Sequence, residues 1–210
     1  MVEKNIPPTY LSELNKHPRD EFITFDEGPH VYTVHGDSTF TSVTTFNHSH
    51  FEEFNADAVI NNMIRRGCLE DPKGKYYGMT KESIKEMWKS KGTSASIAGT
   101  KLHYDIECYN NYMEVDNDSI EFEYFLKFDA DYPDLKPYRT EWMVYYEELK
   151  LSGSIDMVYE KADGTLEIYD WKRVLELKPE GFGGKTAKTE CIKHLPDSNY
   201  WHYALQLNTY

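Results

Sequence analysis

The sequence predicts one domain of the mixed α/β (α+β) class, with a central mixed sheet flanked by helices. Apolar residues recur at helical spacing over much of residues 51–128, and they alternate with polar residues over 139–174. The closing stretch, NYWHYALQLNTY, again has the pattern of a helix. A chain of 210 residues is long enough to bury a core, so we expect a single domain over residues 1–210.

Composition excludes several classes of protein. The chain is 40% hydrophobic and 15% aromatic, which is typical of a globular fold rather than a disordered one. No stretch approaches the ~18 apolar residues of a membrane span, and the polar start does not resemble a secretory signal. The three cysteines lack CxxC spacing and indicate reduced thiols. We therefore expect a soluble intracellular protein, of the cytoplasm or nucleus, without a membrane partner.

The N-terminal part, residues 1–48, is expected to be a strand segment. Residues 1–20 are interrupted by prolines and predict an extended lead-in. The stretches FITF, HVYTVHG and TFTSVTTF then alternate aromatic or β-branched residues with polar ones, which predicts an N-terminal β-meander.

Residues 51–134 form the expected helical segment. The spacing predicts helices over 51–66, 80–92, 94–112 and 119–128, with the first ending at Gly67 and the second at Gly92.

Residues 138–210 are predicted to hold a sheet and the final helix. The strand candidates are RTEWMVYYEE, LSGSIDMVYE and TLEIYDWKRV, and a turn at Lys161-Ala162-Asp163-Gly164 joins the last two. Asp156 and Asp170 are equally distant from residue 163, so this hairpin sets them opposite each other.

Asp170 and Lys172 stand two residues apart on the last predicted strand and should share a face with Asp156. Two carboxylates beside an ammonium are suited to Mg²⁺ or Mn²⁺, with the lysine able to hold or deprotonate a water. The alternative is a solvated polar face with an incidental ion pair, the commoner origin of an isolated D-x-K. His103 and Glu107, at i and i+4 of the third predicted helix, could reach the same cation.

Four motifs occur in order: G-T-x-x-H-x-x-I-E, G-x-I-D, D-W-K and Y-x-x-Q-L-x-x-Y. In this order they resemble the PD-(D/E)XK nuclease superfamily, in its RecB-like, phage-exonuclease-like branch, over about residues 95–210. TFTSVTTF also looks like the entry segment of some viral and phage members, which suggests a viral origin. The resemblance implies a restriction-endonuclease-like core. Two departures are Ile155, where the superfamily name has proline, and the end at Tyr210, where relatives usually continue.

The resemblance implies roles for individual residues. Asp156 and Asp170 would bind the divalent metal, with the Trp171 carbonyl and His103 as further ligands, and Lys172 would orient or activate the attacking water.

Other residues are expected around this centre. Gln206 and Tyr210 would contact the nucleic-acid backbone, and Glu107 and Glu141 would be auxiliary. Residues 103–134 carry a net charge of −9 whereas 172–194 carry +3. The basic loop, with Lys185 and Lys188, is therefore the expected place for an anionic partner.

Together these observations predict a divalent-metal-dependent nuclease. The most favoured form is a DNA exonuclease of recombination, repair or replication, associated or fused with a helicase, a primase or another replication protein. One alternative is a catalytically inactive nuclease fold that binds nucleic acid or acts as a scaffold. Another is a metal-dependent hydrolase of small phosphate esters. The sequence does not determine whether the enzyme cuts from an end or internally, or with which strand polarity. It also does not determine whether the substrate is DNA or RNA, or single- or double-stranded.

Overall fold

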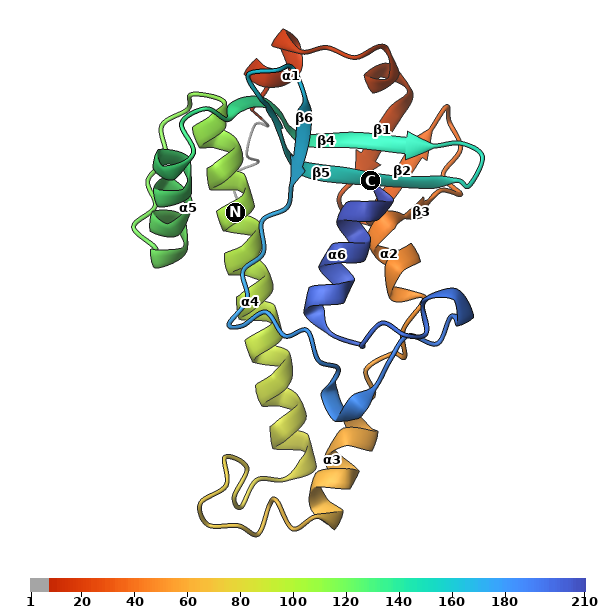
Figure 1. Cartoon of the computed structure of the whole chain (residues 1–210). Coiled ribbons are helices and arrows are strands. Elements are labelled where there is room, and N and C mark those ends of the chain that lie inside the picture. Colours follow the sequence, from red (N-terminus) through yellow and green to blue (C-terminus); the bar gives the residue numbers. More distant parts are fainter. Residues whose placement is uncertain (1–7) are drawn as a thin grey trace. The chain divides into compact units, whose positions relative to one another are not determined.

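A computed structural model describes residues 8–210 and has the predicted α+β architecture, a mixed sheet flanked by helices with a small antiparallel sheet beside it (Figure 1). The chain forms two compact units. The larger unit holds the residues up to Glu52 together with Lys101–Tyr210, and the smaller unit holds Glu53–Thr100. Within residues 8–210, no helix is both long and apolar enough to cross a membrane.

The sheet of the larger unit is built around β5 (Leu151–Glu160). Strand β4 (Lys136–Tyr146) pairs antiparallel with β5 along its whole length. Strand β3 (Thr41–Ser42) pairs parallel with the start of β5, and β6 (Leu166–Tyr169) pairs antiparallel with its end. Because β4 occupies one edge of β5, β3 and β6 share the other edge.

The small sheet is a hairpin of β1 (Ile23–Asp26) and β2 (Val31–Val34). Its buried side chains form one core cluster with a residue of β4; the members are Ile23, Tyr32, Val34 and Tyr145. This cluster attaches the hairpin to the main sheet by burying apolar area.

Two expectations for residues 1–48 are wrong. The lead-in is not extended between residues 10 and 22, because it forms α1 (Tyr10–Leu14) and the 3₁₀ helix η1 (Pro18–Phe22). The part of this expectation that covers residues 1–7 lies outside the described residues. The third strand of the expected meander is also mostly absent, since Val43–His48 form α2. The Ser42 hydroxyl accepts the Thr45 N–H, and this N-cap favours a helix over the β-propensity of the threonines.

The helix α4 (Lys81–Asn110) is continuous, so the expected break at Gly92 is wrong. A glycine costs only about 1 kcal/mol inside a helix, and no proline follows Gly92 to stop it. The end expected at Gly67 is confirmed: α3 (Ala56–Arg65) is followed by Gly67 with φ of 71°. Helix α3 begins later than expected because Asn55 caps it.

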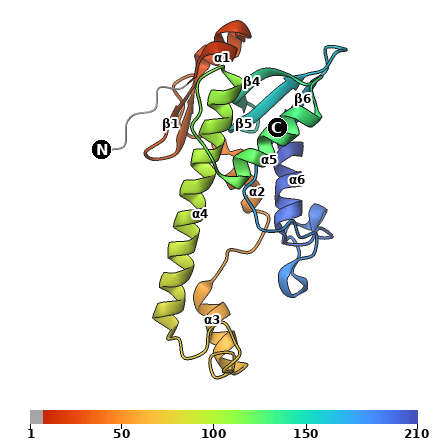
Figure 2. The ribbon, with the colours of Figure 1, turned by 90° about the vertical axis from the view of Figure 1, so that its left-hand side faces the viewer.

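Helix α5 (Ile120–Asp131) is confirmed and packs against the last turns of α4 within the larger unit. Their buried cluster consists of Leu102, Ile106, Phe122 and Phe125. Helix α6 (Asn199–Thr209) lies beside α2 in both views (Figures 1 and 2). The long loop before α6 contains the 3₁₀ turns η2 (Phe182–Gly184) and η3 (Glu190–Ile192).

The smaller unit consists of α3, the first turns of α4 and the loop between them. Ile60 and Ile84 are fully buried in it. Asp57 of α3 lies 2.7 Å from the ammonium groups of both Lys81 and Lys85 of α4.

Candidate functional site

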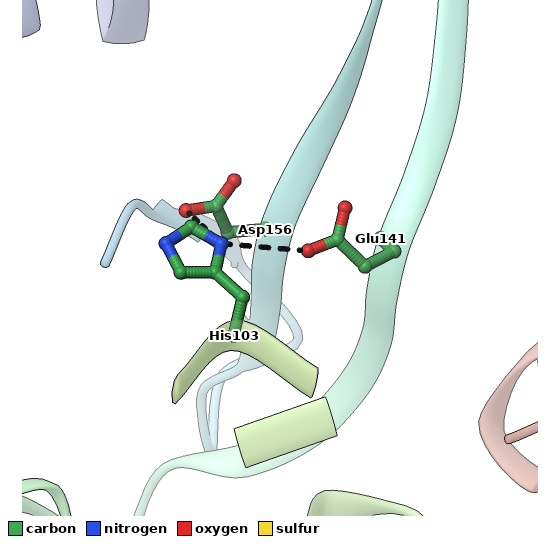
Figure 3. A group of neighbouring side chains, drawn as sticks. All are labelled: His103, Glu141 and Asp156. Carbon is green, nitrogen blue, oxygen red and sulfur yellow. Dashed lines mark ion pairs between the residues drawn. The ribbon is translucent and has the colours of Figure 1, made fainter. Parts of the chain in front are cut away.

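Three side chains from three elements of the larger unit converge: His103 from α4, Glu141 from β4 and Asp156 from β5 (Figure 3). His103 Nδ1 lies 3.5 Å from Asp156 Oδ2 and 3.7 Å from Glu141 Oε1. One nitrogen and two carboxylate oxygens all lie within 4.8 Å of one another. A group of this kind can hold a single cation.

The orientation of His103 is fixed by the backbone. Its Nε2 lies 2.7 Å from the Trp171 carbonyl oxygen, which can only accept a hydrogen bond. Nε2 therefore carries a hydrogen, and in the neutral ring the lone pair of Nδ1 faces the two carboxylates. Burial lowers the pKa of His103, but the nearby carboxylates of Glu141 and Asp156 outweigh it, so the pKa is raised.

Asp156 is nearly enclosed, with 9% of its side chain exposed. Its Oδ2 accepts the Trp171 N–H at 2.9 Å. Burial and the charge of Asp170 raise the pKa of Asp156 to about 6, although His103 and Lys172 oppose this. The protein therefore compensates the negative charge at this position only in part.

Asp170 and Lys172 form the second part of the site. The Lys172 ammonium donates to Asp170 Oδ1 at 2.6 Å and lies 3.9 Å from Asp156 Oδ2. The amide of Gln206 donates to the same Asp170 oxygen at 3.1 Å, and only 4% of the Asp170 side chain is exposed. The structure thus brings together the residues expected from the G-x-I-D, D-W-K and Q-L motifs.

The predicted register of the hairpin is confirmed, because Met157 pairs with Tyr169 and Asp170 is the next residue. The expectation that Asp170 and Lys172 belong to the strand is wrong, since β6 ends at Tyr169. The Trp171 N–H binds the Asp156 carboxylate in place of a strand carbonyl, and its indole packs 5.4 Å from Phe125. These two contacts replace regular strand pairing after Tyr169.

Glu141 has an unusual backbone. Its φ of 41° lies in the left-handed region, which is uncommon for a residue with a Cβ and costs of the order of 1 kcal/mol. Thr140 pairs with Met157 and Trp142 with Ile155, so Glu141 falls opposite Asp156. The Ser154 hydroxyl donates to Glu141 at 2.9 Å and fixes the carboxylate.

Glu107 lies one turn beyond His103 on α4. Burial, with the charge of Glu141, raises its pKa to about 7. Tyr210 follows α6, and its ring lies against Gly153 of β5, where an added Cβ would be 2.7 Å from the ring. This close approach requires glycine at position 153.

A cavity of about 440 Å³ adjoins the site. Its lining includes Glu141, Asp156, Lys172, Gln206 and Tyr210 together with residues of the β1–β2 hairpin. Lys185 and Lys188 are exposed, and the lining residues found in the described part of the chain do not include them. Sequence reasoning missed the hairpin as a wall of this cavity. The alternating aromatic residues of FITF and HVYTV were the available signal, but they indicated strands only.

No family model, curated protein or solved structure matches this chain. The proposed function below is therefore argued from the side chains of the site.

Proposed function

We propose that this protein is a divalent-cation-dependent nuclease of the RecB-like PD-(D/E)XK type, which hydrolyses phosphodiester bonds, with DNA as the favoured substrate. One observation carries the proposal: Asp156, Asp170 and Lys172, which come from two separate motifs, meet beside His103 of a third. A solvated surface face with an incidental ion pair would not bury Asp170 to 4% exposure or give it two donors.

The residues fit Mg²⁺ or Mn²⁺. Carboxylate oxygens are preferred ligands of both ions, and His103 adds an imidazole nitrogen to the two carboxylates. His103, Glu141 and Asp156 present such atoms within 4.8 Å of one another, and burial together with the charge of Asp170 raises the pKa of Asp156. When bound, a cation of this kind neutralises phosphate charge and lowers the pKa of a coordinated water.

The chain's own residues would position the reactants. In hydrolysis a water oxygen bonds to phosphorus and gives up a proton, while the bond from phosphorus to the leaving oxygen breaks and that oxygen takes up a proton to become a hydroxyl. The Lys172 ammonium lies at the edge of the cavity between two carboxylates, where it can donate to the water or to a phosphate oxygen. Gln206 holds Asp170, and Asp170 in turn holds Lys172.

The test is cleavage of end-labelled linear single- and double-stranded DNA in Mg²⁺, Mn²⁺ or EDTA. We expect cleavage only with a cation, and a loss of at least 100-fold in Lys172→Ala and Asp170→Asn. The matched control is Lys161→Ala. Lys161 is an exposed lysine at the turn between β5 and β6, and its ammonium lies 3.1 Å from the Glu167 carboxylate. Thermal melting of each variant separates a lost site from a lost fold.

The pattern of cleavage products distinguishes the type of nuclease, and two other results would contradict the proposal. A ladder of products from one end indicates exonuclease action, and internal fragments indicate endonuclease action. DNA binding without cleavage, unchanged in both site variants, would contradict the catalytic proposal and leave a binding module. Hydrolysis of mononucleotide esters alone would assign the site to small phosphate esters.

A further inference from the structure

The cavity beside the site is lined by two chemically different kinds of side chain. One kind is the charged and polar groups of Glu141, Asp156, Lys172 and Gln206. The other kind comes from the β1–β2 hairpin and consists of the rings of Phe25, His30 and Tyr32. A nucleotide has the same division, with a flat base at one end and an anionic phosphate at the other.

The rings of the hairpin form a compact aromatic group. The Phe25 centroid lies 4.5 Å from that of Tyr32 and 4.8 Å from that of His30. Tyr32 is buried beneath, whereas His30 is exposed and Phe25 is half-buried, so the outer two rings remain accessible. Aromatic and imidazole side chains of this kind stack with unpaired bases of any sequence.

The backbone directs His30 to this place. Its φ of 58° is left-handed, a conformation that histidine, asparagine and aspartate adopt more readily than most residues. His30 contacts Phe25 edge-on at 85°, directly after a turn in which the Gly28 N–H binds Asp26.

The size of the cavity limits what it can hold. Its volume of about 440 Å³ lies near the lower end of the roughly 300–1,000 Å³ usual for ligand pockets. This is room for one nucleotide, whereas a paired duplex end needs its two strands separated first.

We propose that this cavity binds one unpaired nucleotide at the end of a strand, with its base against Phe25 and His30 and its phosphate toward Lys172 and Asp156. The inference rests on the proposed nuclease function and specifies its substrate as a single-stranded or frayed terminus.

The test measures binding separately from cleavage. Labelled single strands with hydrolysis-resistant phosphorothioate linkages are titrated with the protein in Ca²⁺, a hard cation that takes oxygen ligands. Each strand carries an abasic residue at the 3′ end, at the 5′ end or internally. We expect the abasic residue at one of the two ends to weaken binding roughly 5- to 100-fold, the range for losing one base–aromatic stack, and the internal one to change little.

Two variants test whether the aromatic side chains of the cavity bind the base. His30→Asn removes the ring and tolerates the left-handed backbone, and Phe25→Leu keeps apolar volume against Tyr32 without an aromatic face. Each variant should discriminate between normal and abasic ends less than the parent protein does, because one of the two rings is lost. His35→Asn is the matched control, because His35 is also exposed and left-handed, with φ of 49°, and contacts Phe22 instead.

The outcomes separate this inference from the proposed function. Equal affinity of the parent protein for normal and abasic ends, or an equal loss in His35→Asn, would overturn the inference. If Lys172-dependent cleavage persists in that case, the nuclease proposal survives alone. Binding that depends on the terminal base, without cleavage in Mg²⁺ or Mn²⁺, supports the pocket and contradicts the nuclease.

Discussion

Asp20 joins the N-terminal part of the larger unit to the strand that carries Glu141. Its two carboxylate oxygens accept hydrogen bonds from Arg139 at 2.8 Å and from the Trp142 indole at 3.0 Å. Arg139 and Trp142 stand on either side of Glu141 in the chain. Asp20 therefore binds the side chains that precede and follow the left-handed backbone of Glu141. We predict that Asp20→Asn lowers both the stability of the fold and the nuclease activity.

The magnitude follows from burial. The Arg139 side chain is 7% exposed, and without Asp20 its guanidinium keeps the Asn15 carbonyl at 2.9 Å and the face of the Trp142 ring at 4.7 Å, but no carboxylate partner among the described residues. Removing one partner of a buried ion pair costs about 3–5 kcal/mol. Asp20 itself is 27% exposed, and water there reduces the loss. We therefore expect the free energy of unfolding to fall by about 2–3 kcal/mol, which lowers Tm by roughly 4–12 °C.

The stability lost in Asp20→Asn should be largest near neutral pH and smaller in acid. Burial raises the pKa of Asp20, but the hydrogen bond from Arg139 and the bonds from His17 and Trp142 outweigh it, so the pKa is lowered. The carboxylate therefore stabilises the fold above its unfolded pKa of about 3.9, and this contribution is lost as pH falls through the lower folded pKa. The difference between parent and variant should be constant near neutrality and shrink below about pH 4.

Urea unfolding followed by tryptophan fluorescence at several pH values measures this difference. Asp118→Asn, at an exposed position, is the control and should leave stability within about 0.5 kcal/mol. A similarly small change in Asp20→Asn at neutral pH would refute the reasoning, because Arg139 would then not depend on Asp20. A difference that stays constant down to pH 3 would contradict the electrostatic cause.

Three further outcomes are expected. Gly153→Ala places a Cβ 2.7 Å from the Tyr210 ring, so overpacking should lower stability by about 1–3 kcal/mol in thermal melting, and an unchanged Tm would contradict the contact. Gln206→Ala removes one of the two donors to Asp170 and should reduce cleavage about 10- to 100-fold with little change in Tm, whereas equal losses of both would indicate a merely structural role. Mn²⁺ should raise the Tm of the parent protein, by the equivalent of about 2.7 kcal/mol at 100 times Kd, and raise that of Glu141→Gln less; equal rises would exclude Glu141 as a ligand.

Local sequence patterns predicted the parts of the site that depend on local rules. Strand β5 matches its predicted range, and the turn at Asp163-Gly164 sets the register that brings Asp170 to Asp156. Both follow from the two-residue period of a strand and from turn chemistry within one hairpin. The placement of His103 also follows from helical spacing once α4 packs beside the sheet.

The remaining features depend on contacts between distant residues, which no local pattern encodes. The left-handed backbone of Glu141 is held by Asp20, more than a hundred positions away. The departure of Trp171 from the strand requires Asp156 and the aromatic residues of α5. The hairpin wall of the cavity depends on Tyr32 packing against Tyr145 in a shared core cluster.

The site lies where one edge of β5 is uncovered. Strand β3 pairs with residues 151–152 and β6 with 157–160, so in the described chain neither strand pairs with residues 153–156 on that edge. These residues include Gly153, Ser154 and Asp156, which all line the cavity. Along this stretch the Asp156 carboxylate accepts the Trp171 N–H, and the Tyr210 ring lies against Gly153. The first contact sets the position of Asp156 and the second brings Tyr210 into the lining of the cavity, so the site is built on the part of β5 that β3 and β6 leave unpaired.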